Sequence, residues 1–257
     1  DTAGIACLAL TTYPSGKADE ILRAALPSAQ GTARIQIINT LGDRRDAKAV
    51  KLLGQLALGA DPSVANAALA SLGKIGDQAA WKAIAAVPKN SYVTLGPAAI
   101  EAMLRCAEAF ARAGNPKAAL PVYEDLLMAS LPNYIRRAAL DALIRLDKDK
   151  GQQRILQTLH GSDAALKPVA IANVRSLPSG NASALFAAEL PNLAPQEQVW
   201  MIESLAARGD SAAGTAIGGS LASPDAAIRR AAINALGRMG DTWSVAPLAR
   251  ALSRAKD

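Results

Sequence analysis

The sequence predicts an all-α protein, a right-handed solenoid of about seven to eight stacked helical hairpins, and three observations favour this fold. Alanine and leucine dominate the apolar half of the chain, and aromatic residues make up only 4% of it. Alanine is the strongest intrinsic helix former, whereas a β-sandwich or barrel would need β-branched and aromatic residues. In addition, a short phrase recurs along the chain, and each copy ends an apolar-periodic segment at a polar corner. Repetition of this kind is typical of stacked helical repeats.

Each copy of the phrase contains one apolar anchor residue, four positions before the corner. The anchors recur at intervals of 28 to 38 residues, about 32 on average, which is the range of helical-hairpin repeats. We therefore expect a single array over residues 1–257, with a partial repeat at 1–30 and corners near residues 45, 76, 114, 148, 180, 209 and 240. The anchors are Leu41, Leu72, Phe110, Leu143, Leu177, Leu205 and Leu236.

The corners themselves predict how one helix stops and the next begins. Glycine at a helix C-terminus can take the left-handed conformation that closes the last turn. The Asp or Asn that follows can accept hydrogen bonds from the free N–H groups of the next helix. Four corners have this Gly-Asp or Gly-Asn spelling, at Gly76, Gly114, Gly209 and Gly240. Proline near the start of other helices, as at Pro62, suits a first turn because its missing N–H would be unpaired there.

The charge distribution excludes some partners. The formal net charge is +6, but the basic residues are scattered, with no basic run of five or more. Nucleic-acid binding would be indicated by a clustered basic stripe with interleaved aromatics, so nucleic acid is not the expected partner. No apolar stretch reaches the roughly 18 residues that span a bilayer, so we expect no membrane insertion. The chain begins at Asp1 without methionine, which indicates a processed form or a fragment and leaves the compartment open.

The residues needed for common catalytic and metal sites are scarce. The only histidine is His160, and the only cysteines are Cys7 and Cys106. Three repeats separate the two thiols, so they should lie tens of Å apart, beyond the roughly 7 Å between Cα atoms that a disulfide allows. The sequence therefore predicts no catalytic residues, no metal site and no cofactor, and His160 is interpreted as a cation at a helix C-terminus.

The best-formed repeat resembles a known family. Residues 227–241, beginning Ala227-Ile-Arg-Arg, and the following Val245-Ala-Pro-Leu resemble HEAT repeats of the phycobilisome-lyase-like variety. The resemblance implies that the second helix of each hairpin lines a concave face, and that an arginine near its start braces neighbouring repeats. Arg136 and Arg229 occupy that position, and Arg34 matches it less well. Residues 31–50 also resemble HEAT segments of large, often exported bacterial proteins, which implies a module of a larger protein, cytoplasmic or exported.

Stacking of repeats converts each position relative to the anchor into a column of residues along the array. Two residues before the anchor, six of seven positions are polar: Asn39, Ala70, Glu108, Asp141, Arg175, Glu203 and Asn234. Two residues after it, four of seven are basic: Asp43, Lys74, Arg112, Arg145, Ser179, Ala207 and Arg238. The predicted partner-binding residues from these columns and their neighbours are Lys74, Arg112, Arg137, Asp141, Arg145, Arg230, Asn234 and Arg238.

The predicted function is a non-enzymatic interaction scaffold. Its concave face would bind an extended or acidic protein or peptide, or an adjacent domain of the same chain. A purely solubilising surface explains the same columns. Two further alternatives follow from resemblance: a nucleic-acid-binding protein like the HEAT-like DNA glycosylases, and a bilin lyase subunit. The chain departs from the glycosylases in its few aromatic residues.

Overall fold

A computed structural model describes residues 2–14, 16–88, 95, 97–128, 130–178, 181–240 and 242–254. Helices are the only regular secondary structure in these ranges, so the predicted all-α class is confirmed. The chain divides into two compact units, Asp1–Leu131 and Pro132–Asp257, which we call unit 1 and unit 2. The continuous array over the whole chain stays a prediction.

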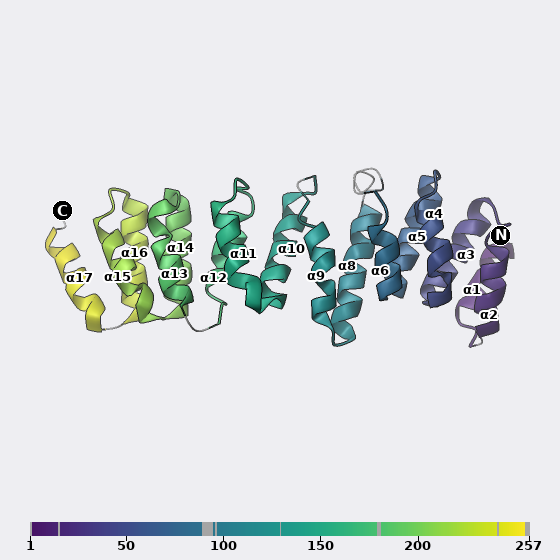
Figure 1. Cartoon of the computed structure of the whole chain (residues 1–257), viewed down its shortest axis with the longest axis horizontal. Helices are drawn as coiled ribbons and strands as arrows, with labels where there is room; N and C mark the ends of the chain where they lie inside the picture. Colours follow the sequence, from purple (N-terminus) through teal and green to yellow (C-terminus); the bar gives the residue numbers. More distant parts are fainter. Residues whose placement is uncertain are drawn as a thin grey trace. The chain divides into compact units, whose positions relative to one another are not determined.

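Unit 1 contains the helices α1 to α9, numbered as in Figure 1. They are α1 (Thr2–Thr11), α2 (Gly16–Ala25), α3 (Gly31–Asp43), α4 (Val50–Ala57), α5 (Pro62–Ile75), α6 (Gln78–Ala85), α8 (Pro97–Arg112) and α9 (Leu120–Asp125), with 3-10 turns at Ala47–Ala49 and Pro116–Ala119. Helix α3 packs against α1 and α5, and α5 packs against α8, so these helices form one row. We call it the anchor row, because α3, α5 and α8 carry the anchor residues.

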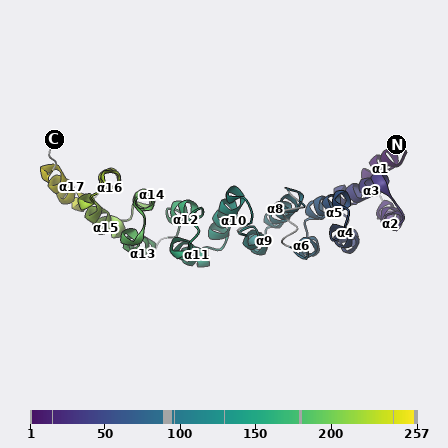
Figure 2. The same cartoon turned by 90° about the horizontal axis from the view of Figure 1, so that it is seen from above.

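Unit 2 repeats this arrangement. It consists of α10 (Asn133–Leu146), α11 (Lys148–His160), α12 (Lys167–Val174), α13 (Ala182–Ala188), α14 (Pro195–Arg208), α15 (Gly214–Gly219), α16 (Ala226–Met239) and α17 (Thr242–Arg254), with 3-10 turns at Leu190–Asn192, Ser211–Ala213 and Ser220–Ala222. Its anchor row is α10, α12, α14 and α16, in which each helix packs against the next. Figure 2 shows, within each unit, this row beside a second row formed by the alternate helices.

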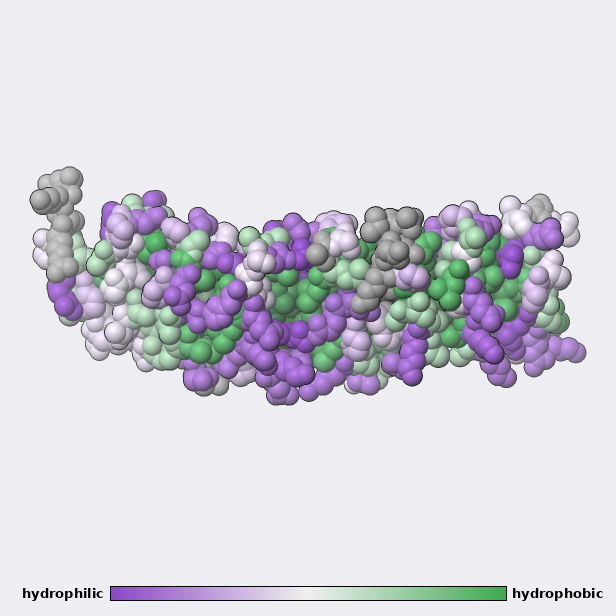
Figure 3. Space-filling model, turned by 45° about the horizontal axis from the view of Figure 1, so that its top comes forward, coloured by the Kyte–Doolittle hydropathy of each residue, from purple (hydrophilic) through white to green (hydrophobic). Residues whose placement is uncertain are grey.

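The anchors form the core of both units. All seven are buried, and the most exposed of them, Leu177, retains only 8% of its accessible surface. Helices of the anchor row approach very closely in unit 1: a Cβ added to Gly73 would lie 2.7 Å from the Cα of Ala102 on α8. In the space-filling view, hydrophobic residues show as separate patches between hydrophilic ones (Figure 3). The repeated leucine thus marks the interior, as its spacing predicted.

The glycine corners have the predicted conformation. Gly76, Gly114, Gly209 and Gly240 all have positive φ, between 66° and 76°. At the corner near residue 45 the same left-handed place is taken by Arg45, with φ 52°. A side chain in this conformation costs roughly 1–2 kcal/mol, because Cβ crowds the following carbonyl oxygen. The corner near 148 turns at Asp147 without glycine, and the corner near 180 falls on residues 179 and 180, outside the described ranges.

The capping predictions are correct at two of the glycine corners. Asp77 accepts a hydrogen bond from the backbone N–H of Ala80 (2.7 Å), and Asp210 accepts one from Ala212 (3.0 Å). Asn115 makes no such bond, so that prediction is wrong; its backbone (φ −121°, ψ 64°) lies outside the extended region usual for a cap. The remaining predicted cap, Asp241, lies outside the described residues.

Two arginines, both three residues after an anchor, close the C-terminal end of the preceding anchor-row helix. Arg44 Nη1 donates to the carbonyl oxygens of Leu10 and Tyr13, each at 2.7 Å, and its Nε bonds Asp19. The bond to Asp19 raises the pKa of Arg44. In unit 2, Arg208 Nη1 donates to two carbonyl oxygens at 2.9 Å, those of Val174 and Leu177. Both guanidinium groups satisfy carbonyls that a helix end leaves open.

The two cysteines are free and buried, as predicted. Burial, together with the Asp77 carboxylate, raises the pKa of the Cys106 thiol to about 12. This thiol therefore stays protonated near neutral pH and behaves as a small apolar core residue.

Candidate functional site

The predicted basic residues share one structural position. Lys74, Arg112, Arg145 and Arg238 each lie in the last turn of an anchor-row helix, on α5, α8, α10 and α16 respectively. Cations are favourable there because the free carbonyl groups give a helix C-terminus partial negative charge. The recurrence of basic residues at this position thus has a structural explanation. Only a basic side chain that has no carboxylate partner within the protein indicates a binding site.

In unit 1 the basic side chains are paired within the protein. Lys74 Nζ lies 2.6 Å from Asp43 Oδ1, and Arg112 Nη2 lies 3.3 Å from Glu108 Oε2. Both residues border a hollow of about 240 Å³ at the C-terminal ends of α3, α5 and α8.

The hollow is also lined by Arg105, whose Nη2 lies 2.7 Å from Glu101 Oε1, and by the exposed Arg45, whose side chain has no ion pair within the described residues. Arg45 is thus the one charged side chain in the described lining of this hollow that is left unpaired.

In unit 2 a larger hollow lies beside α10 and α12. It measures about 730 Å³, and its polar lining includes Asp141, Arg145, Lys148, Asn173 and Arg175. Asp141 is fully engaged: Oδ1 accepts from Asn173 Nδ2 at 2.9 Å, and Oδ2 lies 3.2 Å from Arg145 Nη1. Lys148 has no hydrogen bond or ion pair to any described residue.

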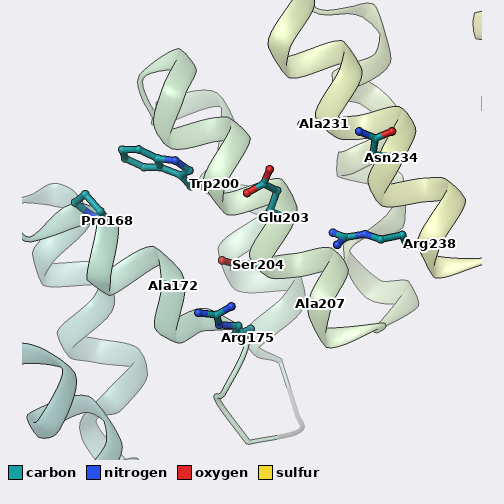
Figure 4. Close-up of a pocket in the computed structure, with 10 residues that line it drawn as sticks. All are labelled: Pro168, Ala172, Arg175, Trp200, Glu203, Ser204, Ala207, Ala231, Asn234 and Arg238. Carbon is teal, nitrogen blue, oxygen red and sulfur yellow. The ribbon is translucent and has the colours of Figure 1, made fainter.

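A second hollow, of about 740 Å³, continues across α12, α14 and α16 (Figure 4). It shares Ala172 and Arg175 with the first, so the two hollows adjoin at α12. Hollows of this size fall within the range of ligand sites. We call these two adjoining hollows together the unit 2 groove. It is defined by Asp141, Arg145, Lys148, Arg175, Trp200, Glu203, Asn234 and Arg238.

The unit 2 groove contains charged side chains that the protein does not neutralise. Arg175, Glu203 and Arg238 are all exposed. Within the described part of the chain, none of these three side chains has a hydrogen bond or an ion pair. Figure 4 shows them as sticks around the same hollow, with the Trp200 ring reaching toward Pro168. Together with Lys148, the groove therefore presents four unpaired charges, whereas the smaller hollow of unit 1 presents one, Arg45, among its described residues.

The structure divides the predicted partner-binding residues into three groups. Asp141, Arg145, Asn234 and Arg238 lie together in the unit 2 groove, whereas Lys74 and Arg112 border the separate hollow of unit 1. Arg137 and Arg230 line none of these three hollows, and Arg137 Nε instead donates to the carbonyl oxygen of Ala165 at 2.7 Å. Whether any of the eight binds a partner stays a prediction.

The predicted partner-binding set omitted four residues of the groove: Lys148, Arg175, Trp200 and Glu203. Arg175 and Glu203 stood in the polar column before the anchors but were not among the residues predicted to bind a partner. Lys148 begins α11 immediately after the Asp147 corner, and the column analysis followed only positions near the anchors. Trp200 is one of three tryptophans spread widely along the sequence, so composition alone does not single it out. A usable signal was its place three residues before Glu203 on one helix, since residues three apart share a helix face.

The predicted bracing arginines differ in what they contact. Arg136, whose side chain is 8% exposed, pairs with Asp163 in the loop before α12, so it does link neighbouring repeats. Arg229 reaches only carbonyl oxygens just before its own helix, those of Ser223 and Pro224, both at 2.8 Å. The Nε of Arg34 is buried without a hydrogen-bond partner among the described residues.

The described ranges contain no group of three or more His, Cys, Asp and Glu side chains placed to hold a metal ion. His160 is the last residue of α11, so its predicted place at a helix C-terminus is confirmed. Its Nε2 also lies 2.9 Å from Glu189 Oε2, in the residue after α13. In the described residues we find no helix that is both long and apolar enough to span a membrane.

The fold and the groove define a protein of stacked helical repeats with a polar groove in unit 2. Residues 228–254 match the family model described as PBS lyase HEAT-like repeat, which confirms the resemblance for the last hairpin. A comparison with curated proteins gives no match.

Three solved structures are similar to this chain. Human deoxyhypusine hydroxylase in complex with glycerol has 20% identity and a TM-score of 0.41, covering 91% of this chain and 88% of that chain. The complex of CpcE and CpcF of phycocyanin lyase from Nostoc sp. has 19% identity and a TM-score of 0.36, with coverages of 88% and 82%. An engineered protein has 18% identity and a TM-score of 0.38, with coverages of 86% and 68%.

These similarities correct one expectation. We predicted from the repeats that the chain is not an enzyme. That prediction is wrong, because a hydroxylase and a lyase are among the similar structures. An array of helical repeats therefore does not exclude catalysis. At 20% identity or less, the similarities also assign no activity or substrate to this chain.

Proposed function

We propose that this chain is an interaction scaffold whose unit 2 groove binds an extended, net-acidic peptide segment. The segment would belong to a partner protein or to a neighbouring domain of the same polypeptide. The observation that carries the proposal is the set of unpaired charges, Arg175, Glu203 and Arg238, in a groove that crosses successive helices. With Lys148 and Arg145 the cations of the groove outnumber its carboxylates, which favours a net-acidic ligand.

The dimensions of the groove support an extended ligand. Packed helices lie about 8–10 Å apart, so the four helices from α10 to α16 span roughly 24–30 Å. An extended chain advances about 3.1–3.4 Å per residue, so eight or nine residues would cover that distance. A compact small molecule would contact only one of the two hollows.

The mixed signs of the groove favour a peptide over a nucleic acid. Asp141 and Glu203 lie among its cations. A phosphate backbone carries regularly spaced negative charge, so these carboxylates would oppose it. A peptide can offer either sign at each position. Groove polar groups such as Asn234 can also hydrogen bond a peptide backbone, which an extended segment leaves free.

The proposal predicts that neutralising two groove arginines weakens peptide binding while the same change elsewhere does not. The probe is a fluorescein-labelled ten-residue peptide of alternating glutamate and serine, followed by fluorescence anisotropy at low ionic strength. We expect the double variant Arg175→Gln/Arg238→Gln to bind about tenfold more weakly, because two exposed ion pairs contribute about 0.2–1 kcal/mol each.

The matched control is Lys74→Gln/Arg112→Gln in unit 1, which removes the same two positive charges. It should bind within about twofold of the unchanged protein, because these side chains already pair with Asp43 and Glu108. Equal weakening in both double variants would mean non-specific attraction and would contradict the proposal. Tighter binding of a DNA duplex of similar length, lost in the groove variant, would favour the nucleic-acid alternative instead.

A further inference from the structure

In the part of the unit 2 groove that crosses α12, α14 and α16, the unpaired charges alternate in sign from helix to helix. Arg175 lies at the C-terminal end of α12, Glu203 lies on α14, and Arg238 lies on α16. The place on α14 that corresponds to Arg238 is taken by Ala207, so no cation of α14 offsets Glu203 inside the hollow. The order across these three helices is therefore positive, negative, positive.

Glu203 also has an aromatic neighbour on its own helix. Trp200 precedes it by three residues, a spacing that places both on one helix face, and both line the same hollow. The Trp200 side chain is partly exposed and has no hydrogen bond within the described residues. An indole face attracts cations, and an adjacent carboxylate supplies the opposite charge. Together they favour a lysine or arginine side chain at the middle of the groove.

The spacing of these features matches one backbone conformation. Adjacent anchor-row helices lie about 8–10 Å apart, and a polyproline II helix advances about 9.3 Å per turn of three residues. In that conformation, residues i, i+3 and i+6 point to the same side. In a β-strand, i and i+3 point to opposite sides, so a strand could not present all three to the groove.

We propose that the occupant of the unit 2 groove is a polyproline II segment with an acidic residue at i, a basic residue at i+3 and an acidic residue at i+6. The acidic side chains pair with Arg175 and Arg238, and the basic side chain lies on Trp200 and pairs with Glu203. This assignment rests on the proposed function, since it names the charge order of the peptide that the groove binds.

Three peptides test the assignment with the full chain. Each has the form Glu-Pro-Pro-X-Pro-Pro-Glu, in which proline favours polyproline II and X is Lys, Gln or Glu. Affinities are measured by competition against the labelled glutamate–serine peptide. We expect the Lys peptide to bind about tenfold more tightly than the Gln peptide, and the Glu peptide to bind most weakly.

Two protein variants test the middle position of the peptide, X, by changing the groove residues that contact it. Glu203→Lys should invert the order, so that the Glu peptide binds more tightly than the Lys peptide. Trp200→Leu should reduce the Lys-over-Gln preference by about threefold while leaving the affinity of the Gln peptide within about twofold. Equal binding of the three peptides, or an order unchanged by Glu203→Lys, would overturn the assignment.

The outcomes also separate this inference from the proposed function. If the glutamate–serine peptide depends on Arg175 and Arg238 but none of the proline peptides competes with it, the charge order is wrong and the acidic-peptide groove stands. If neither kind of peptide binds, both proposals fail.

Discussion

Replacing Gly73 with alanine should lower the free energy of unfolding of unit 1 by about 1–3 kcal/mol, because a new side chain must separate packed helices. A Cβ at this position would lie 2.7 Å from the Ala102 Cα and 3.2 Å from its Cβ and carbonyl oxygen. These are mainly backbone atoms, which cannot move aside without shifting α8. The loss should exceed the gain of up to about 1 kcal/mol that alanine normally provides over glycine within a helix.

The control for this prediction is Gly237→Ala at the equivalent place in unit 2, one residue after the anchor Leu236. No described atom lies within 4 Å of a Cβ placed there. The higher helix propensity of alanine should therefore be the main effect, and it should raise the free energy of unfolding by up to about 1 kcal/mol. Urea unfolding of the full-length chain, followed by circular dichroism, gives both values. Destabilisation by both variants would show that packing between anchor-row helices is not the cause.

Replacing Arg136 with alanine should destabilise unit 2 by about 2–4 kcal/mol, since it removes a buried ion pair and leaves a cavity. The Arg136 side chain is 8% exposed; its guanidinium group pairs with Asp163 and donates from Nη1 to Asn133 Oδ1 at 3.0 Å. These contacts hold the loop before α12 against the start of α10. Because the Asp163 side chain is 38% exposed, water can solvate it, which places the expected loss below that of a fully enclosed pair.

Arg145→Ala on the same helix is the comparison for Arg136→Ala. The Arg145 side chain is 69% exposed and pairs only with Asp141, four residues earlier. Such pairs contribute about 0.3–0.5 kcal/mol, so thermal unfolding of Arg145→Ala should stay close to that of the unchanged protein. A similar loss for the two variants would contradict the bracing role of Arg136.

The features that could be predicted from sequence are those that act locally and recur. A leucine at each anchor and a glycine at each left-handed corner follow from helix geometry alone, so Leu72 and Gly76 were identified without any tertiary contact. Arg45 was not identified as a left-handed residue, because no glycine stands at that position to indicate the conformation. The division into two units likewise reflects contacts between distant residues.

The candidate site was predictable in part. The columns located Arg145, Asn234 and Arg238, but they gave no information on which charges are neutralised inside the protein. Part of that information is local. Arg112 and Arg145 have a carboxylate four residues earlier, Glu108 and Asp141, whereas Arg238 has the neutral Asn234. Pairing between repeats, as between Lys74 and Asp43, becomes visible only when the register of stacked helices is known.

The central claim is that unit 2, and not unit 1, carries the binding groove, and hydrogen exchange of the full chain tests it most directly. Exchange is measured by mass spectrometry with and without an excess of the glutamate–serine peptide. The account predicts slower exchange in Lys167–Val174, Pro195–Arg208 and Ala226–Met239, and unchanged exchange in Gly31–Asp43, Pro62–Ile75 and Pro97–Arg112. Protection of the unit 1 helices instead, or equal protection of both units, would contradict it.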